Sequence, residues 1–221
     1  FFVIPLSIAL IIFRAQFVRV ILGAGNFDWE DTIITFEILK FFAISLFAQS
    51  LIPLFARAFF AFQNTRTPLF IALASEAIHI GSIPFLLPYF DVEGLAIAFT
   101  LGSIMNITLL YIFFRAHLKN WNDRDFLLPI LKISFAAILA GIIAQFSKSI
   151  FALTTNELDT FVEIFLQLAI GLTIGGVSYV FFCFWLRVSE LDLLKRFLLH
   201  KILRQPETVA LAEDHPERGE W

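Results

Sequence analysis

Two long apolar stretches joined by a short, twice-positive turn constrain this chain more than any other feature. The stretches lie within residues 33–115, and the turn between them has the sequence RAFFAFQNTRTP at 57–68. A bilayer core about 30 Å thick needs roughly 20 apolar residues in one helix to cross it. The pattern therefore predicts a membrane-spanning helical hairpin whose basic turn, with Arg57 and Arg66, faces the cytoplasm.

The composition extends this prediction to the whole chain. Of its 221 residues, 59% are hydrophobic and 16% are charged, whereas soluble domains have about 45–50% and about 25%. Only helices and closed barrels satisfy their backbone hydrogen bonds in lipid, and strand-like alternation is absent. We therefore expect an all-α polytopic membrane protein with six transmembrane helices, at residues 1–22, 33–60, 68–87, 94–114, 127–146 and 161–186.

Basic residues between these spans fall almost entirely on one side. The cytoplasmic side of the predicted topology holds twelve of them: Arg57, Arg66, Arg115, Lys119, Arg124, Lys132, Arg187, Lys195, Arg196, Lys201, Arg204 and Arg218. The other side holds Arg19 and Lys148 among many acidic residues. The positive-inside rule then places both ends of the chain in the cytoplasm, as an even number of spans requires.

The two ends of the chain carry further expectations. It begins with Phe1 and not with Met, and it enters an apolar run at once, which suggests a fragment without its N-terminal part. Residues 188–204 predict a cytoplasmic amphipathic helix held at the headgroup layer, or else a plain helical extension with a solvated charged face. Residues 205–221 predict a disordered tail.

A few polar residues lie at membrane depth. Glu76 and His79 share one face of the third span, and Asn106 lies in the fourth. Because a charge in the bilayer is costly, the Glu76–His79 pair predicts either a proton- or substrate-responsive site or an interhelical hydrogen-bonded pair. For Asn106, an interhelical hydrogen bond competes with lining a polar path.

Proline and glycine mark two other features of the spans. Pro53 lies inside the second span, where it should kink the helix, as a hinge or as a static packing feature. Small residues at Ala137, Gly141, Gly171, Gly175 and Gly176 predict close packing of the fifth and sixth spans.

Three segments resemble the MurJ/MviN family of lipid II flippases, within the multidrug/oligosaccharidyl-lipid/polysaccharide exporter superfamily. They are FVRVILGAGNFD at 17–28 with DT at 31–32, ARAFFA at 56–61 with NTRTP at 64–68, and GLAIA at 94–98 continuing through Asn106 to Arg115. The second is the most specific. Three places depart from the family pattern. Asn64 replaces a usual Asp, Gly23-Ala24 replaces a charged pair, and His79 replaces a common Asn, with Glu76 unusual beside it.

The resemblance implies the last six of fourteen spans. Residues 1–118 would be four spans of the second transporter lobe, and 119–187 an appended two-helix hairpin beside a groove for a lipid tail. It implies a gate turn formed by Arg57, Asn64, Thr65, Arg66, Thr67 and Pro68, with Pro53 as hinge. For Arg57 and Arg66, simple topological anchoring is the alternative.

The function implied is movement of an undecaprenyl-pyrophosphate-linked peptidoglycan precursor from the inner to the outer leaflet of the bacterial cytoplasmic membrane. The alternatives are export of another lipid-linked oligosaccharide or a drug, and a non-transporting scaffold for cell-wall synthesis proteins. A membrane enzyme would need clustered acidic or His residues at one interface, and the acidic outer loops lack any metal-ligand spacing. The single Cys183 excludes a disulfide framework. We expect no cofactor, no metal and no nucleic-acid partner, but membrane lipids and the missing N-terminal lobe as partners.

Overall fold

The described part of the chain is entirely helical apart from its connections. The computed structural model describes residues 1–221 except 24–27, 119–122, 155–160, 189 and 192–221. Its helices are α1 (Val3–Ile12), α2 (Arg14–Leu22), α3 (Trp29–Ala61), α4 (Arg66–His117), α5 (Asp123–Thr154) and α6 (Phe161–Trp185). The all-α prediction is therefore confirmed.

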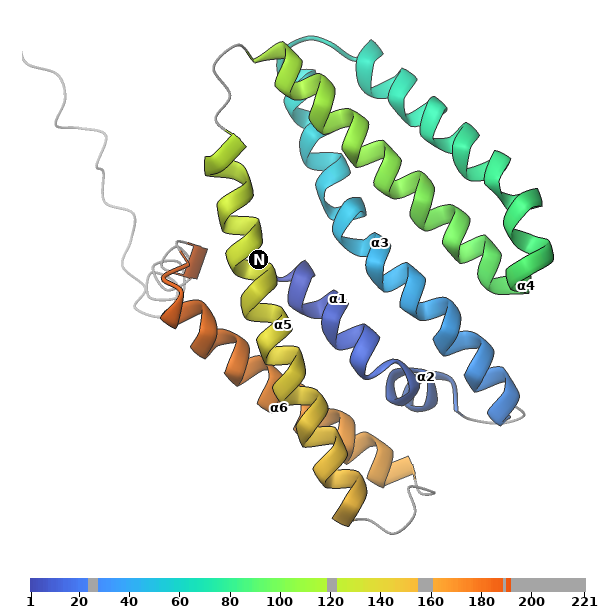
Figure 1. The fold of residues 1–221 in the computed structure, drawn as a ribbon, viewed down its shortest axis with the longest axis vertical. Helices are drawn as coiled ribbons and strands as arrows, with labels where there is room; N and C mark the ends of the chain where they lie inside the picture. The colour runs from blue at the N-terminus through green and yellow to red at the C-terminus, as the bar shows by residue number, and fades with distance from the viewer. Residues whose placement is uncertain (24–27, 119–122, 155–160, 189, 192–221) are drawn as a thin grey trace, which may run out of the picture.

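Within the described residues, α3, α4, α5 and α6 are each long and apolar enough to cross a membrane. Helix α4 has 52 residues, which as a straight helix would be about 78 Å long. Instead it folds back at Asp91, where the backbone leaves the helical region with φ 45° and ψ −132°, and Figure 1 shows its two arms side by side. These arms correspond to the predicted third and fourth spans.

A close approach makes the return of α4 possible. A Cβ on Gly94 would lie 2.9 Å from the carbonyl carbon and oxygen of Leu86. Only glycine allows the second arm to begin so near the backbone of the first. Helical structure thus continues past Leu87, the predicted end of the third span, to the corner at Asp91.

The first predicted span differs most from expectation. Residues 1–22 were predicted as one helix, but they form α1 and α2, which meet at Phe13 with a bend of 82°. Helix α1 has ten residues, about 15 Å of rise, which is half of the bilayer core. No glycine lies at the bend, and the only nearby proline is Pro5, so the local sequence does not explain it. Tertiary contacts with α5 and α6 hold the bend.

The break places α1 and α2 between two antiparallel pairs. Helix α4 packs on α3, and α5 packs on α6. Helix α1 lies between α3 and α5, while α2 contacts α3 and α6 (Figure 1). The broken element therefore joins the two pairs.

The start of α3 follows from its sequence. The Asp28 carboxylate accepts from the Asp31 backbone N–H at 3.0 Å, and the Asp31 carboxylate accepts from the Asp28 N–H at 3.4 Å. Such a capping box satisfies two N–H groups that the first turn leaves free. The two carboxylates also suit the positive end of the helix dipole.

Most of the predicted amphipathic helix at 188–204 and all of the predicted tail at 205–221 lie outside the described residues. Val188 and Leu191 are described, and both are buried in a cluster with residues of α5 and α6.

Candidate functional site

The turn between α3 and α4 is closed by backbone hydrogen bonds. The Asn64 N–H donates to the Phe59 carbonyl at 3.0 Å, and the Gln63 N–H donates to the Phe60 carbonyl at 2.9 Å. This pair of bonds is a Schellman motif, which needs a left-handed residue after the helix. Gln63 supplies it with φ 57°.

Asn64 then starts the next helix. Its Oδ1 accepts from the Thr67 backbone N–H at 3.1 Å, and its Nδ2 donates to the Thr67 hydroxyl at 2.9 Å. Asparagine therefore performs the capping role that aspartate would have here. Pro68 is buried in the first turn of α4, where its missing N–H costs no intrahelical bond.

The predicted cationic residues of the turn point away from the chain. Arg57, Thr65 and Arg66 are exposed, and no carboxylate of the described residues lies within 4.0 Å of either guanidinium. Both arginines are thus available to groups outside this chain. Their role at a gate stays a prediction.

Below the turn, aromatic rings fill the space between α3 and the second arm of α4. Phe55 lies 5.2 Å from Phe114 and 5.8 Å from Phe126 between ring centroids, in edge-to-face geometry. Phe59 lies 5.9 Å from Phe114 and is 1% exposed. These rings give the turn a rigid base.

Glu76 and His79 form the predicted pair, within one helix. His79 Nδ1 lies 2.9 Å from Glu76 Oε1, and the two side chains are 20% and 63% exposed respectively. His79 also lies against the second arm of α4, with its ring edge-to-face on Phe99 at 5.6 Å. The Glu76 carboxylate is therefore largely exposed on the described chain, and whether the pair is a responsive site or an interhelical contact stays a prediction.

Asn106 does not form the predicted interhelical hydrogen bond. Its Oδ1 is buried and has no hydrogen-bond partner among the described residues, and the same holds for Ser75 Oγ. Pro53 lies inside α3, which remains helical on both sides of it. Whether Pro53 is a hinge stays a prediction.

The bend between α1 and α2 is held by polar groups from α5 and α6. Lys148 Nζ donates to the Ile12 carbonyl at 3.1 Å, one of the acceptors that the end of α1 leaves unpaired. Gln16 Nε2 donates to Gln167 Oε1 at 2.9 Å, and Gln167 Nε2 to the Lys148 carbonyl at 3.3 Å. These bonds tie both halves of the break to the α5–α6 pair.

Phe13, at the bend, packs onto a glycine of α6. A Cβ on Gly171 would lie 2.3 Å from Phe13 Cζ, and one on Gly141 would lie 2.7 Å from Ile8 Cγ2. Of the small residues predicted to join the fifth and sixth spans, Gly175 and Ala137 do so. A Cβ on Gly175 would lie 3.2 Å from Ala144 Cβ, and Ala137 is buried in a cluster with Tyr179 of α6. Gly141 instead packs against Ile8 of α1, and Gly171 packs against Phe13 at the bend. Sequence spacing could not reveal these contacts.

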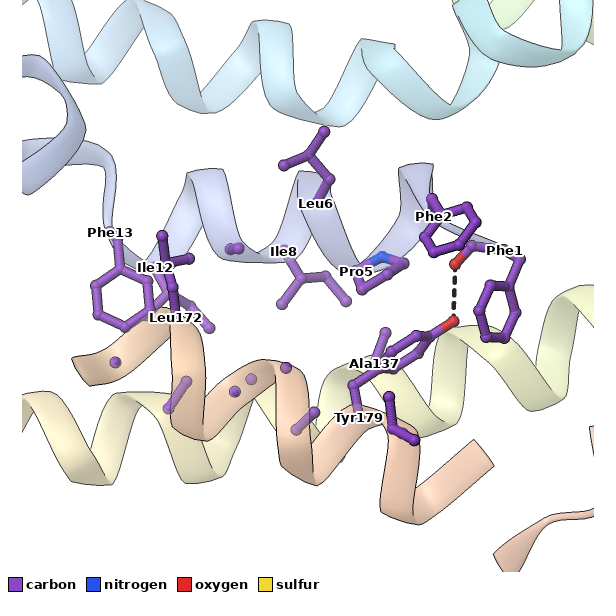
Figure 2. A pocket seen from close by; sticks show the side chains of 18 residues that line it. Phe1, Phe2, Pro5, Leu6, Ile8, Ile12, Phe13, Ala137, Leu172 and Tyr179 are labelled. Atoms are coloured by element: carbon purple, nitrogen blue, oxygen red, sulfur yellow. Dashed lines mark hydrogen bonds between the residues drawn. The ribbon is translucent and has the colours of Figure 1, made fainter. Parts of the chain in front are cut away.

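A cavity of about 340 Å³ runs between α1, α5 and α6. Figure 2 shows Pro5 of α1 above Ala137 and Tyr179, Ile8 on the side of α1 that faces α5 and α6, and Ile12 beside Phe13 and Leu172. The Tyr179 hydroxyl donates to the Phe1 carbonyl at 2.7 Å, so the polar groups of this wall are already paired. The cavity suits an apolar chain.

No three His, Cys, Asp or Glu side chains come together as metal ligands in the part of the chain that the structure describes. The sequence model of the family described as "Lipid II flippase MurJ" matches residues 1–168. The chain belongs to this family.

Curated relatives agree with the family match. The chain is 26% identical over 179 residues to the "Probable lipid II flippase MurJ" of Bdellovibrio bacteriovorus, covering 81% of this chain and 34% of that protein. It is 29% identical over 199 residues to the "Lipid II flippase MurJ" of Thermosipho africanus, covering 90% and 37%. The chain therefore spans about a third of these relatives' length.

A solved structure shares the fold. It is described as "Lipid II flippase MurJ, inward closed conformation", with a TM-score of 0.64 and 22% identity. The match covers 92% of this chain and 37% of that one. The helical arrangement of this chain is thus similar to part of that solved structure.

Proposed function

We propose that this chain is the C-terminal part of a transporter that moves a lipid-linked peptidoglycan precursor from the inner to the outer leaflet. The match of residues 1–168 to the lipid II flippase family carries this proposal. Movement would occur by alternating access, and the remaining lobe of the protein would supply the groups that bind the headgroup.

The proposed topology has six spans with both ends in the cytoplasm. The two arms of α4 would each cross the bilayer, and α1 with α2 would form a broken span. In this topology residues 1–118 belong to the second lobe of the transporter, and α5 and α6 are the appended hairpin. The twelve-to-two distribution of basic residues supports the orientation.

The apolar cavity between α1, α5 and α6 would receive part of the polyprenyl tail. Its lining is aliphatic and aromatic, and its one wall hydroxyl is paired with a backbone carbonyl. An occupant without polar groups leaves no hydrogen bond unmade there.

At the cytoplasmic end, Arg57 and Arg66 would pair with headgroups or with acidic groups of the other lobe. Their exposure and their lack of a carboxylate partner in the described chain support this role. The rigid Schellman turn and its aromatic base would hold the two guanidinium groups in place, and Pro53 would allow α3 to bend.

Complementation by the full-length protein tests this function. Cells depleted of their own lipid II flippase should grow when the wild-type protein is expressed, and the precursor should become accessible in the outer leaflet. An Arg57→Gln/Arg66→Gln protein should lose most of this activity, while Lys132→Gln, an exposed lysine of α5, should keep it.

Charge-conserving variants separate gating from anchoring. Arg57→Lys/Arg66→Lys preserves the positive-inside signal but not the planar pairing of guanidinium with phosphate or carboxylate. If this protein is fully active, the arginines only orient the chain. Rescue of capsule or drug export but not of growth would identify a sibling exporter. Loss of function on deleting residues 189–221 alone would indicate a scaffold.

A further inference from the structure

A second groove, about 680 Å³ in volume, lies between α1, α3 and α5. Ile8, Ile12 and Gly141 line both this groove and the apolar cavity described above. The two spaces are therefore neighbours on either side of these residues. The second groove differs in its polar lining, which consists of Arg14, Gln145 and Lys148.

The charges around this groove do not cancel. Arg14 Nη2 lies 3.2 Å from Glu37 Oε1, and Lys40 bridges Glu37 and Glu93. These four side chains balance one another. Lys148 remains, since no carboxylate of the described residues lies within 4.0 Å of its Nζ. The groove thus carries one unbalanced positive charge.

The Lys148 ammonium also retains hydrogen-bonding capacity. One of its three N–H donors serves the Ile12 carbonyl. An ammonium at the edge of an apolar groove is unfavourable without an anion. Lys148 is, moreover, one of only two basic residues in the predicted connections of the acidic side of the protein, so the positive-inside rule does not account for it.

We propose that this groove binds one anionic membrane phospholipid. Its phosphodiester would lie against Lys148 and Arg14, at the bend between α1 and α2, and an acyl chain would follow the apolar surface of α1. A phosphodiester carries a single negative charge, which matches the single uncompensated cation, whereas the pyrophosphate of a polyprenyl carrier would exceed it. The lipid site is separate from the transport function proposed above.

Lipid retention by the full-length protein provides the test. The protein is purified from membranes, exchanged into nanodiscs with equal phosphatidylglycerol and phosphatidylcholine, and its bound lipid is counted by native mass spectrometry. Wild type should retain phosphatidylglycerol, and Lys148→Gln should retain about fivefold less, as expected for removing one cation from a lipid headgroup. Lys132→Gln, also on α5, should match wild type.

A conservative variant and a competition complete the test. Lys148→Arg should restore retention, because it keeps the charge at the groove. Equal retention by wild type and Lys148→Gln would overturn the proposal. So would displacement of phosphatidylglycerol from wild type by stoichiometric polyprenyl pyrophosphate, because the occupant would then be the transported lipid. Transport activity in the same preparations shows independently whether the function proposed above holds.

Discussion

The α3–α4 pair and the assembly of α1, α2, α5 and α6 hold together by different means. In the first, α3 and α4 pack mainly through large rings such as Phe55, Phe59 and Phe114. In the second, alanines and glycines leave room for a short helix, and amide and ammonium groups satisfy its broken backbone.

The difference reflects which interactions stabilise helix packing in a bilayer. Lipid tails are as apolar as the side chains, so apolar burial alone does not drive helices together, and close packing and hydrogen bonds must do so. Unbroken helices need only shape complementarity. A broken helix also needs partners for its free backbone groups, and the polar bonds at the α1–α2 bend supply them.

The largest effect is expected from emptying the aromatic cluster. Phe59→Ala should lower the free energy of unfolding by about 3 kcal/mol, because a ring 1% exposed leaves a cavity. Thermal unfolding of the full-length protein in detergent, followed by circular dichroism, measures this. The neighbouring Phe60→Ala, 52% exposed, should change little; equal losses would show that the cluster is not the base of the turn.

A slightly smaller effect should come from filling the space used by Phe13. Gly171→Ala should cost about 2 kcal/mol by overpacking, since its Cβ would lie 2.3 Å from the ring. Gly176→Ala is the matched control on the same helix, as nothing lies within 4 Å of its Cβ position. Adding Phe13→Leu to Gly171→Ala should recover part of the loss. Additive effects of these two changes would mean that the contact is absent.

The amide pair at the bend should contribute less than the packing does. Gln167→Leu should destabilise the protein by about 1 kcal/mol, because Gln16 loses its acceptor and the bend loses one tie. Gln16→Leu/Gln167→Leu should cost less than the sum of the single changes, measured by the same unfolding curves. A fully additive double mutant would show that the two amides do not interact.

The smallest change concerns the corner of α4. Asp91→Gly should raise the free energy of unfolding by about 0.5 kcal/mol, because glycine adopts φ 45° without strain, offset partly by its greater freedom when unfolded. Asp91→Ala removes the same charge but keeps the strain, so it should not stabilise. If both variants behave alike, the charge of Asp91 matters and its backbone does not.

Much of the fold could be predicted because hydropathy and local capping signals act over short distances. The apolar runs located α3, both arms of α4, α5 and α6, and the sequence around Asn64 located the turn. The pairing of Glu76 with His79 followed from helical spacing, since residues three apart share a face. Family membership likewise followed from short motifs and was confirmed by the match over residues 1–168.

The bend at Phe13 could not be predicted. Residues 1–13 are mostly apolar and are followed by Arg14, Gln16 and Arg19, but neither glycine nor proline lies at Phe13 to interrupt a helix. Its cause lies far along the chain, at Lys148, Gln167 and Gly171. The same limit applied to Asn106, whose predicted hydrogen bond depended on what the neighbouring helix presents.

By itself, then, the sequence determined that this protein is a bundle of apolar helices, where most of them begin and end, and to which family it belongs. These properties depend on the free energy of placing each segment in lipid and on capping within a few residues. Only the tertiary structure decided that the first span breaks, that Gly141 and Gly171 receive α1, and that Lys148 turns back to the Ile12 carbonyl. Those features arise from contacts between segments more than 100 residues apart, where shape and hydrogen bonding across helices outweigh local helical preference.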